Sequence, residues 1–270
     1  MNVFVITGAS DGIGAEIARQ LARTHGAGAA LVLAARNQAK LEETAQQCRA
    51  AGAKAEGVMT DVAQEGQCRA LVDKAMQLFG RIDVLVNNAG MSAHALFSDV
   101  RAQDLHWYED LMRVNFWGSV WCTHAALPHL KASRGNVVAV SSLAGLYGVP
   151  GRTAYSATKF AMTGFFEALR TELRPAGVGV TIAFPGVVAT QIRHRGYNAR
   201  GEAAGKSGLK EDKAMSVDEC ARRIIDGMER RAREVVMEPR AKIGRFLKLV
   251  APGAVENMAL AALKDEAKPS

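Results

Sequence analysis

Tyr155 and Lys159 are the two residues whose types and spacing most directly suggest chemistry. They stand four positions apart in the predicted helix Ala154–Arg174, so their side chains share one face. A free tyrosine has a pKa of about 10 and exchanges protons poorly near neutral pH, but a nearby ammonium group lowers that pKa. The pair could therefore pass a proton to or from a substrate, although a tyrosine and a lysine at this spacing are common in helices.

Two further polar residues strengthen this interpretation. Ser142 follows the predicted strand Asn136–Ser141 and precedes Tyr155 by thirteen residues, so its hydroxyl could donate to a substrate oxygen as negative charge develops there. Asn115 lies among apolar residues in a predicted helical region over residues 104–130. A buried amide needs hydrogen-bond partners, so Asn115 is either part of the same site or a structural residue that bends its helix.

A glycine-rich segment, Thr7–Gly14, separates the first predicted strand from the first predicted helix. Glycines let the backbone turn sharply and approach a pyrophosphate closely, and a helix N-terminus offers unpaired N–H groups. This position favours nucleotide binding over a plain glycine turn. The spacing Gly-x-x-x-Gly-x-Gly differs from the usual Gly-x-Gly-x-x-Gly of dinucleotide-binding proteins.

The end of the second predicted strand favours NADP(H) over NAD(H). An acidic residue there would bind the ribose diol of NAD, but Leu33–Asn37 contains no carboxylate and includes Arg36. A guanidinium group suits a phosphate, so we expect Arg36 to bind the 2′-phosphate. The alternative is an ordinary solvated arginine in a loop.

Short apolar runs alternate with longer helical stretches along the chain. Parallel strands need crossover helices, so this alternation predicts a three-layer α/β/α doubly wound parallel sheet (a Rossmann fold) in a single domain, residues 1–270. Ligands bind such sheets at the carboxyl ends of the strands. The predicted strands are 3–7, 31–35, 55–60, 82–87, 136–141 and 178–184, and the predicted helices are 13–24, 38–51, 64–79, 104–130 and 154–174.

Composition excludes several other classes of protein. The chain is 49% hydrophobic and 23% charged, its four cysteines are scattered, and no apolar run approaches the roughly 18 residues of a membrane span. We therefore expect no metal site and no disulfides. Because the predicted strand at Val3–Ile6 comes so early in the sequence, we expect no signal peptide and a cytoplasmic protein. Residues 191–270 hold 17 Lys+Arg and 12 Asp+Glu, so most of the net charge of +7 lies there, which argues against nucleic-acid binding.

In their order and spacing, these motifs resemble the single-domain branch of the short-chain dehydrogenase/reductase superfamily from Val3 to about Thr190. The resemblance implies a catalytic tetrad of Asn115, Ser142, Tyr155 and Lys159. Tyr155 would protonate the carbonyl oxygen, Ser142 would orient it, Lys159 would lower the tyrosine pKa and hold the nicotinamide ribose, and Asn115 would position a water for proton resupply. The implied cofactor contacts are Gly8, Ser10, Asp11, Gly12, Ile13, Gly14, Arg36, Asn37, Asp61, Val62, Asn88, Ala89, Gly90, Tyr155, Lys159, Pro185, Gly186, Val188 and Thr190.

One position departs from the family pattern. Asp11 stands where many NADP-preferring relatives carry a basic residue, which leaves Arg36, with Asn37, as the main expected contact to the 2′-phosphate. The family also implies a homodimer or homotetramer, formed through the long helices near residues 104–130 and 154–174.

The expected substrate is a small lipophilic ketone or aldehyde, or the corresponding alcohol. Its candidate contacts are mostly apolar or aromatic: Ser92, His94, Ser142, Leu143, Tyr147, Val149 and Val187. Residues 191–215 are predicted to form a mobile lid. The alternatives are a reductase of 3-oxoacyl groups on an acidic carrier protein, a non-catalytic nucleotide sensor, and a nucleic-acid binder.

Residues 236–270 are predicted to form a helical C-terminal extension, with helices near 240–250 and 255–263. This basic, amphipathic tail resembles that of hydroxysteroid-dehydrogenase-like reductases. A basic amphipathic helix can lie on an anionic membrane surface. We favour packing at the mouth of the pocket or on a second subunit.

Overall fold

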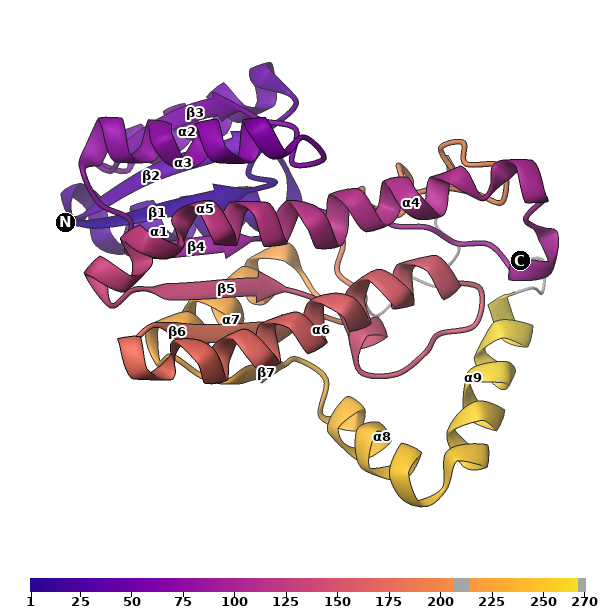
Figure 1. Cartoon of the computed structure of the whole chain (residues 1–270). Helices are drawn as coiled ribbons and strands as arrows, with labels where there is room; N and C mark the ends of the chain where they lie inside the picture. Colours follow the sequence, from indigo (N-terminus) through magenta and orange to yellow (C-terminus); the bar gives the residue numbers. More distant parts are fainter. Residues whose placement is uncertain (206–213, 267–270) are drawn as a thin grey trace.

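Seven parallel strands form one sheet at the centre of the molecule (Figure 1), in the order β3-β2-β1-β4-β5-β6-β7. The computed structural model describes residues 1–205 and 214–266, without the side chains of residues 239, 240, 242, 258 and 261–266. The strand order reverses between β1 and β4, as in a doubly wound sheet. The strands are β1 (Asn2–Thr7), β2 (Ala29–Ala35), β3 (Lys54–Met59), β4 (Val84–Asn87), β5 (Asn136–Val140), β6 (Gly179–Phe184) and β7 (Glu234–Val236).

Helices cover both faces of this sheet, which gives the predicted three-layer α/β/α fold. One face carries α1 (Gly12–His25), α2 (Gln38–Ala50) and α7 (Val217–Glu229), and the other carries α3 (Glu65–Phe79), α5 (Gly118–Ser133) and α6 (Thr153–Leu173). A short helix, α4 (His106–Met112), precedes α5.

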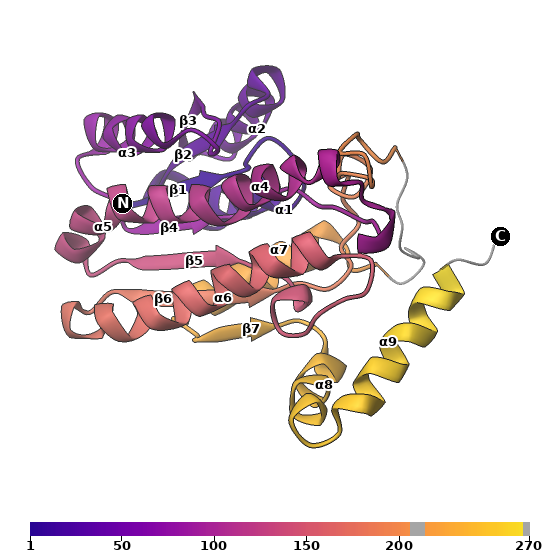
Figure 2. The same cartoon turned by 45° about the vertical axis from the view of Figure 1, so that its right-hand side comes forward.

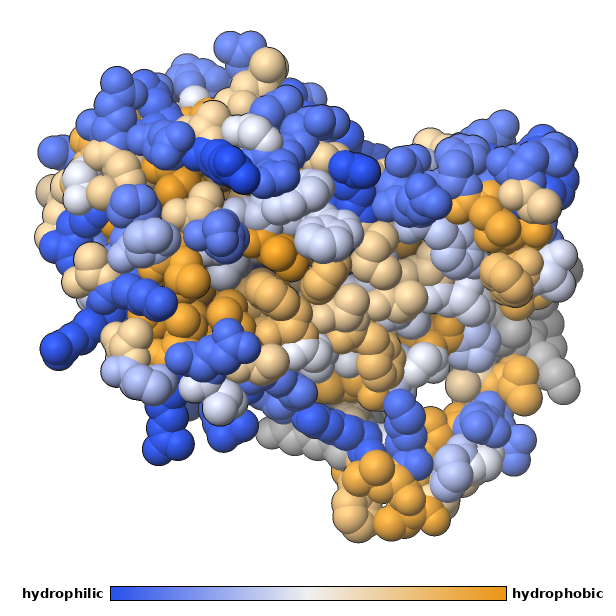
Figure 3. Space-filling model, viewed as in Figure 1, coloured by the Kyte–Doolittle hydropathy of each residue, from blue (hydrophilic) through white to orange (hydrophobic). Residues whose placement is uncertain are grey.

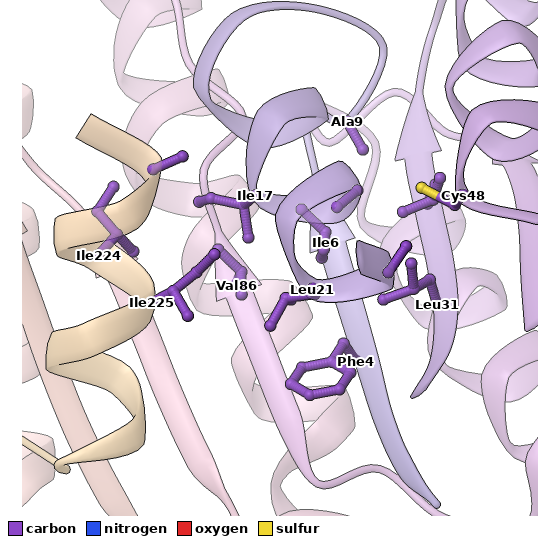
Figure 4. Close-up of a cluster of buried hydrophobic side chains, with 14 of the residues drawn as sticks. Phe4, Ile6, Ala9, Ile17, Leu21, Leu31, Cys48, Val86, Ile224 and Ile225 are labelled. Atoms are coloured by element: carbon purple, nitrogen blue, oxygen red, sulfur yellow. The ribbon is translucent and has the colours of Figure 1, made fainter. Parts of the chain in front are cut away.

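Alternation of side chains along the strands divides the core into two clusters. Phe4 and Ile6 of β1 point to the side of α1 and α7, while Val5 between them points to the side of α3 and α6. Figure 4 shows the first cluster, in which Ile17 and Leu21 of α1 and Ile224 and Ile225 of α7 lie over the strands. Because both faces are buried, inner strands such as β2 and β5 are continuous runs of buried residues, whereas the edge strand β3 contains Lys54 and Glu56.

Two features of the fold differ from the sequence prediction. The helix α7 and the strand β7 were not predicted, although Ser216 caps α7 by accepting a hydrogen bond from the backbone N–H of Glu219. The region predicted as one long helix is interrupted by a π-helical turn at Arg113–Trp117, with Asn115 at its centre. Such turns mark places where a helix departs from regular hydrogen bonding, often beside functional sites.

The C-terminal extension forms two helices, α8 (Pro239–Val250) and α9 (Pro252–Glu266), which project from the β7 edge of the sheet (Figures 1 and 2). Arg245 pairs with Glu234 at 2.9 Å, and Lys248 lies over the ring of Phe160 on α6, so α8 packs against the body of the fold. Four apolar residues of α8 are exposed: Ile243, Phe246, Leu249 and Val250. No helix within the described ranges is long and apolar enough to cross a membrane.

The segment predicted as a lid is described over residues 191–205, 214 and 215, and the remainder of the prediction falls outside the described residues. Its first part is tied to the loop after β4: the Tyr197 N–H donates to the Ser92 carbonyl at 3.0 Å, and the His94 N–H donates to the Tyr197 carbonyl at 2.9 Å. This segment, which is called the lid below after the prediction, therefore lies beside the carboxyl ends of the strands; its mobility stays a prediction.

Candidate active site

The glycine loop after β1 takes the shape that a close approach to phosphate requires. Gly8 and Gly12 have φ values of +67° and +54°, a region that disfavours other residues. A Cβ on Gly14 would lie 2.4 Å from the Gly8 carbonyl oxygen, and one on Gly12 would lie 3.3 Å from the Thr190 methyl carbon. The loop is thus a cradle of bare backbone at the N-terminus of α1, which fits the pyrophosphate of a dinucleotide.

Asn88 and Thr7 hold this loop against the end of β4. The Asn88 side-chain amide donates to the carbonyls of Thr7 and Gly8 at 3.0 and 3.2 Å. The Thr7 hydroxyl accepts from the N–H groups of Asn88 and Ala89, each at 3.0 Å. These bonds join two neighbouring strand ends, so the predicted Asn88–Gly90 segment acts first as a support for the cradle.

Tyr155 and Lys159 lie side by side in α6 and are both buried, at 8% and 4% exposure. The Lys159 Nζ atom is 5.7 Å from the centre of the Tyr155 ring and donates to the Val140 carbonyl at 3.0 Å. Ser142, just beyond the end of β5, lines the same cavity as Tyr155 and Lys159. The structure thus brings three of the four predicted catalytic residues together at the carboxyl edge of the sheet.

The surroundings of Tyr155 lower the pKa of its phenol. Burial opposes ionisation, but Lys159, Arg152, the hydrogen bond from Ser142 and Arg193 together outweigh it. The pKa of Lys159 is also lowered, because burial and Arg152 disfavour its ammonium form more than Tyr155 favours it. A phenol that ionises more easily is the property needed in a general acid and base near neutral pH.

Asn115 is fully buried and ties the loop after β4 to α6. Its side-chain oxygen accepts from the Met91 N–H at 2.7 Å, and its amide donates to the Met91 carbonyl and the Thr158 hydroxyl, each at 3.0 Å. A Cβ on Gly90 would lie 3.1 Å from the Asn115 Oδ1 and 3.8 Å from the Lys159 Nζ. Asn115 therefore lies directly behind the tyrosine and lysine, and its role in positioning a water stays a prediction.

A cavity of about 440 Å³ runs from the glycine loop to Tyr155. Most of the predicted cofactor contacts and three of the predicted catalytic residues line it: Gly8, Ser10, Asp11, Gly12, Ile13, Arg36, Asn37, Asp61, Val62, Asn88, Ala89, Gly90, Ser142, Tyr155, Lys159, Pro185, Gly186, Val188 and Thr190. Gly14 and Asn115 stand behind this wall.

The other predicted substrate contacts lie around the cavity rather than in its wall. Ser92 is buried and accepts a hydrogen bond from Arg152 at 2.7 Å, while His94 is half-buried in the same loop. Leu143 belongs to the core on the α6 side, and Tyr147 packs against that core. Val149 packs against the apolar cluster that contains Tyr155, and the Val187 carbonyl accepts from the Met215 N–H at 2.9 Å.

Several residues of the cavity wall were missed by sequence reasoning. They include three arginines, Arg152, Arg193 and Arg195, although no basic residue was expected beside the substrate. Arg152 lies three residues before Tyr155, about one helical turn, so helical spacing could have indicated it. Arg193 and Arg195 come from the lid, and nothing in their local sequence shows where that segment folds.

Asp11 is the N-cap residue of α1 and lies close to two positively charged side chains. Its carboxylate caps the helix through the Gly12 N–H at 2.7 Å, pairs with Arg195 of the lid and lies 3.7 Å from Lys40 Nζ. Burial raises the pKa of this carboxyl. The hydrogen bonds from Arg195 and Gly12 and the nearby positive charges lower it by more, so the pKa lies below its usual value. Asp11 stands where many NADP-preferring relatives carry a basic residue, and Arg195 and Lys40 compensate its negative charge.

Comparison with known proteins agrees with this geometry. The family model described as short chain dehydrogenase matches residues 2–200. The 11-beta-hydroxysteroid dehydrogenase-like 4A of Arabidopsis thaliana is 39% identical over 238 residues, which cover 88% of this chain and 76% of that protein. The 11-beta-hydroxysteroid dehydrogenase A of Sesamum indicum is 35% identical over 260 residues, covering 94% and 73%.

Solved structures show the same similarity. A short chain dehydrogenase/reductase from Burkholderia phymatum, in complex with NAD, matches with a TM-score of 0.79 and 27% identity, covering 94% of each chain. An alcohol dehydrogenase from the archaeon Thermococcus sibiricus, complexed with 5-hydroxy-NADP, matches with a TM-score of 0.73 and 26% identity, covering 88% of this chain and 96% of that one. The chain therefore belongs to the short-chain dehydrogenase/reductase superfamily, among its hydroxysteroid-dehydrogenase-like members, and is an oxidoreductase of a family that binds a nicotinamide cofactor.

Proposed function

We propose that the protein is an NADP(H)-dependent oxidoreductase that interconverts a lipophilic ketone or aldehyde and its alcohol, with Tyr155 as the general acid and base. One observation carries this proposal: Tyr155, Lys159 and Ser142 line the same cavity as the glycine cradle and Arg36. The nicotinamide cofactor, when bound, supplies or accepts the hydride.

The chain's own residues account for the proton side of the reaction. Tyr155 has a lowered pKa and can give its proton to a carbonyl oxygen or take one from an alcohol. Ser142 orients and polarises the same oxygen from the end of β5. Lys159 favours the phenolate and would hold the nicotinamide ribose, while the cradle at Gly8–Gly14 and Thr190 would hold the pyrophosphate.

Charge at the far end of the cavity supports NADP(H). Arg36 and Asn37 line the cavity at the end of β2, where no carboxylate is present to bind a ribose diol. The carboxylate of Asp11 is paired with Arg195, so it does not oppose a phosphate with an uncompensated charge. The solved relatives carry NAD in one case and an NADP derivative in the other, so the preference rests on Arg36.

Apolar surroundings of Tyr155 support a lipophilic substrate. Tyr155 belongs to a cluster with Ala93, Trp107 and Leu111, against which Met91 and Val149 pack. The relatives named as hydroxysteroid dehydrogenases point to the same class of compound.

A panel of ketones, aldehydes and alcohols tests the proposal. The oxidation of NADPH and of NADH is followed by the absorbance of the reduced nicotinamide, and the panel includes bulky lipophilic ketones and an acetoacetyl thioester. We expect turnover of lipophilic carbonyl compounds with NADPH and its loss in Tyr155→Phe. A preference for the thioester would favour the 3-oxoacyl reductase instead, and a preference for NADH would contradict the cofactor assignment.

A further inference from the structure

Arg152 is the N-cap residue of α6, and its guanidinium group lies over the face of the Tyr155 ring. The Arg152 Cζ atom lies 4.2 Å from the centre of that ring, well within the range of about 6 Å over which a cation and an aromatic face attract each other. Its backbone carbonyl accepts from the Ser156 N–H at 2.8 Å, so the residue is fixed to the first turn of the helix. Arg152 also lines the cavity.

We propose that Arg152 is a positioning residue that fixes the Tyr155 ring and stabilises its phenolate form, and that Ser92 holds Arg152 in place. The inference rests on the proposed role of Tyr155 as the acid and base. The Arg152 Nη2 atom donates to the Ser92 hydroxyl at 2.7 Å, and Ser92 itself is held in the loop after β4 through its carbonyl, which accepts from Tyr197 of the lid. The contact thus joins α6, this loop and the lid.

A second cation beside Tyr155 matters because Lys159 can lose its positive charge. Lys159 is buried and its pKa is lowered, so its ammonium form is easier to lose than that of an exposed lysine. An arginine side chain keeps its charge at every pH at which the protein is folded. Arg152 therefore supplies a permanent positive charge beside Tyr155, whatever the protonation state of Lys159.

The charged and polar groups that face Tyr155 come from three parts of the chain. Lys159 lies in α6 and Arg152 is the N-cap of that helix, while Ser142 follows β5 and Arg193 comes from the lid. All four favour the phenolate form of Tyr155. Beside Arg152, the half-buried His94 has a lowered pKa, because burial and the arginine disfavour its charged form. The neutral form of His94 is therefore favoured beside Arg152.

Direct titration of Tyr155 tests the inference without substrate or cofactor. The near-ultraviolet absorbance of tyrosinate is recorded against pH for the protein and for Tyr155→Phe, and the difference reports Tyr155 alone. We expect Arg152→Met to move this ionisation to higher pH by about 1 unit, as the loss of an adjacent opposite charge requires. Arg152→Lys should move it less, and Ser92→Ala should move it in the same direction by a smaller amount.

A matched control is Arg195→Met, which removes a different arginine of the same cavity wall and should leave the Tyr155 ionisation where it is. The same upward shift should appear in the pH profile of kcat/KM for alcohol oxidation. An unchanged titration in Arg152→Met, together with lowered activity, would overturn the inference, because a merely structural arginine would give that result. If Arg152→Met does not fold, the titrations of Arg152→Lys and Ser92→Ala test the inference instead. An unchanged Tyr155 ionisation in both variants would also overturn the inference.

The two proposals can fail separately. If no carbonyl compound is reduced, the proposed function fails, while the titration still measures the effect of Arg152 on Tyr155. If the enzyme is active and the titration does not respond to Arg152, only the present inference fails.

Discussion

The Nζ atom of Lys159 lies 5.7 Å from the centre of the Tyr155 ring and 3.0 Å from the Val140 carbonyl oxygen. The lysine is thus held against the end of β5 while its charge acts on the phenol one helical turn before it. Removing the phenol hydroxyl should therefore remove the proton transfer and leave the cavity intact. We expect Tyr155→Phe to lower kcat by about 10²–10⁴-fold.

Cofactor binding separates this effect from misfolding. The binding of NADPH to Tyr155→Phe, followed by the fluorescence of the reduced nicotinamide, should stay close to that of the unchanged protein. Full activity in the variant would show that another group transfers the proton.

The sequence predicted the sheet and the catalytic edge because most inner strands are apolar runs, several of them followed directly by polar residues of the site. Thr7, Asn88 and Ser142 all stand at or just beyond strand ends, so the order of elements was enough to bring them to one edge. The strand β7 was missed because it has only three residues and pairs along β6 alone. The π-helical turn at Asn115 was missed because its neighbours are as apolar as those of a regular helix.

Contacts between distant segments were beyond sequence reasoning. The pairing of Asp11 with Arg195 joins residues 184 positions apart, and the contact of Arg152 with Ser92 joins residues 60 positions apart. Neither depends on periodicity; both depend on how the lid and the loop after β4 fold over the strand ends. For the same reason most of the predicted substrate contacts lie behind the wall of the cavity.

Arg36→Asp should change the preference between the two cofactors. The guanidinium group would make charge-assisted hydrogen bonds to a 2′-phosphate, each worth about 1.5–3 kcal/mol, so we expect the ratio of kcat/KM for NADPH over NADH to fall by at least about 10-fold. Arg69→Asp, on the exposed side of α3 and away from the cavity, is the matched control and should leave the ratio unchanged. An unaltered ratio in Arg36→Asp would contradict the assignment of Arg36 to the phosphate.

Asp11 should contribute to stability in a way that depends on pH. Its pKa is lowered in the folded protein, so its charge stabilises the fold at pH values above the ordinary pKa of an aspartate. This contribution is lost as the pH falls through the lowered pKa. We therefore expect Asp11→Asn to lower Tm at neutral pH and to match the unchanged protein in acid, as measured by thermal denaturation across pH.

Asparagine is also a good N-cap, so Asp11→Asn removes the charge and keeps the cap, whereas Asp11→Ala removes both. The alanine variant should be less stable than the asparagine variant by about 1 kcal/mol at every pH. Equal Tm values for all three proteins at neutral pH would show that neither the cap nor the pairing with Arg195 stabilises the fold.

Gly14→Ala should disturb the cradle, because a Cβ there would lie 2.4 Å from both the Gly8 carbonyl oxygen and the Asn88 amide nitrogen. Backbone must move to relieve such contacts, and overpacking of this kind costs about 1–3 kcal/mol. We expect a lower free energy of unfolding in denaturant and weaker binding of the cofactor. Gly66→Ala on α3 is the control, since a Cβ there meets nothing within 4 Å; equal behaviour of the two variants would mean that the loop adapts freely.

Assembly through the face formed by α5 and α6 is the last prediction. Figure 3 shows apolar side chains gathered over this face, where Trp117 is 45% exposed and stacks on Trp121, and Phe160 is 38% exposed. Exposed aromatic residues at this density are typical of an interface between subunits. A charge at the centre of such an interface would be buried without a partner, so Trp117→Glu should dissociate the homodimer or homotetramer.

Light scattering coupled to size-exclusion chromatography measures the mass of each variant. Phe246→Glu is the matched control, because Phe246 is also exposed but belongs to α8 rather than to α5 or α6. Loss of the oligomer in Phe246→Glu and not in Trp117→Glu would move the interface to the C-terminal helices. In that case the exposed apolar side of α8 would be covered by the second subunit, and the face of α5 and α6 would be free.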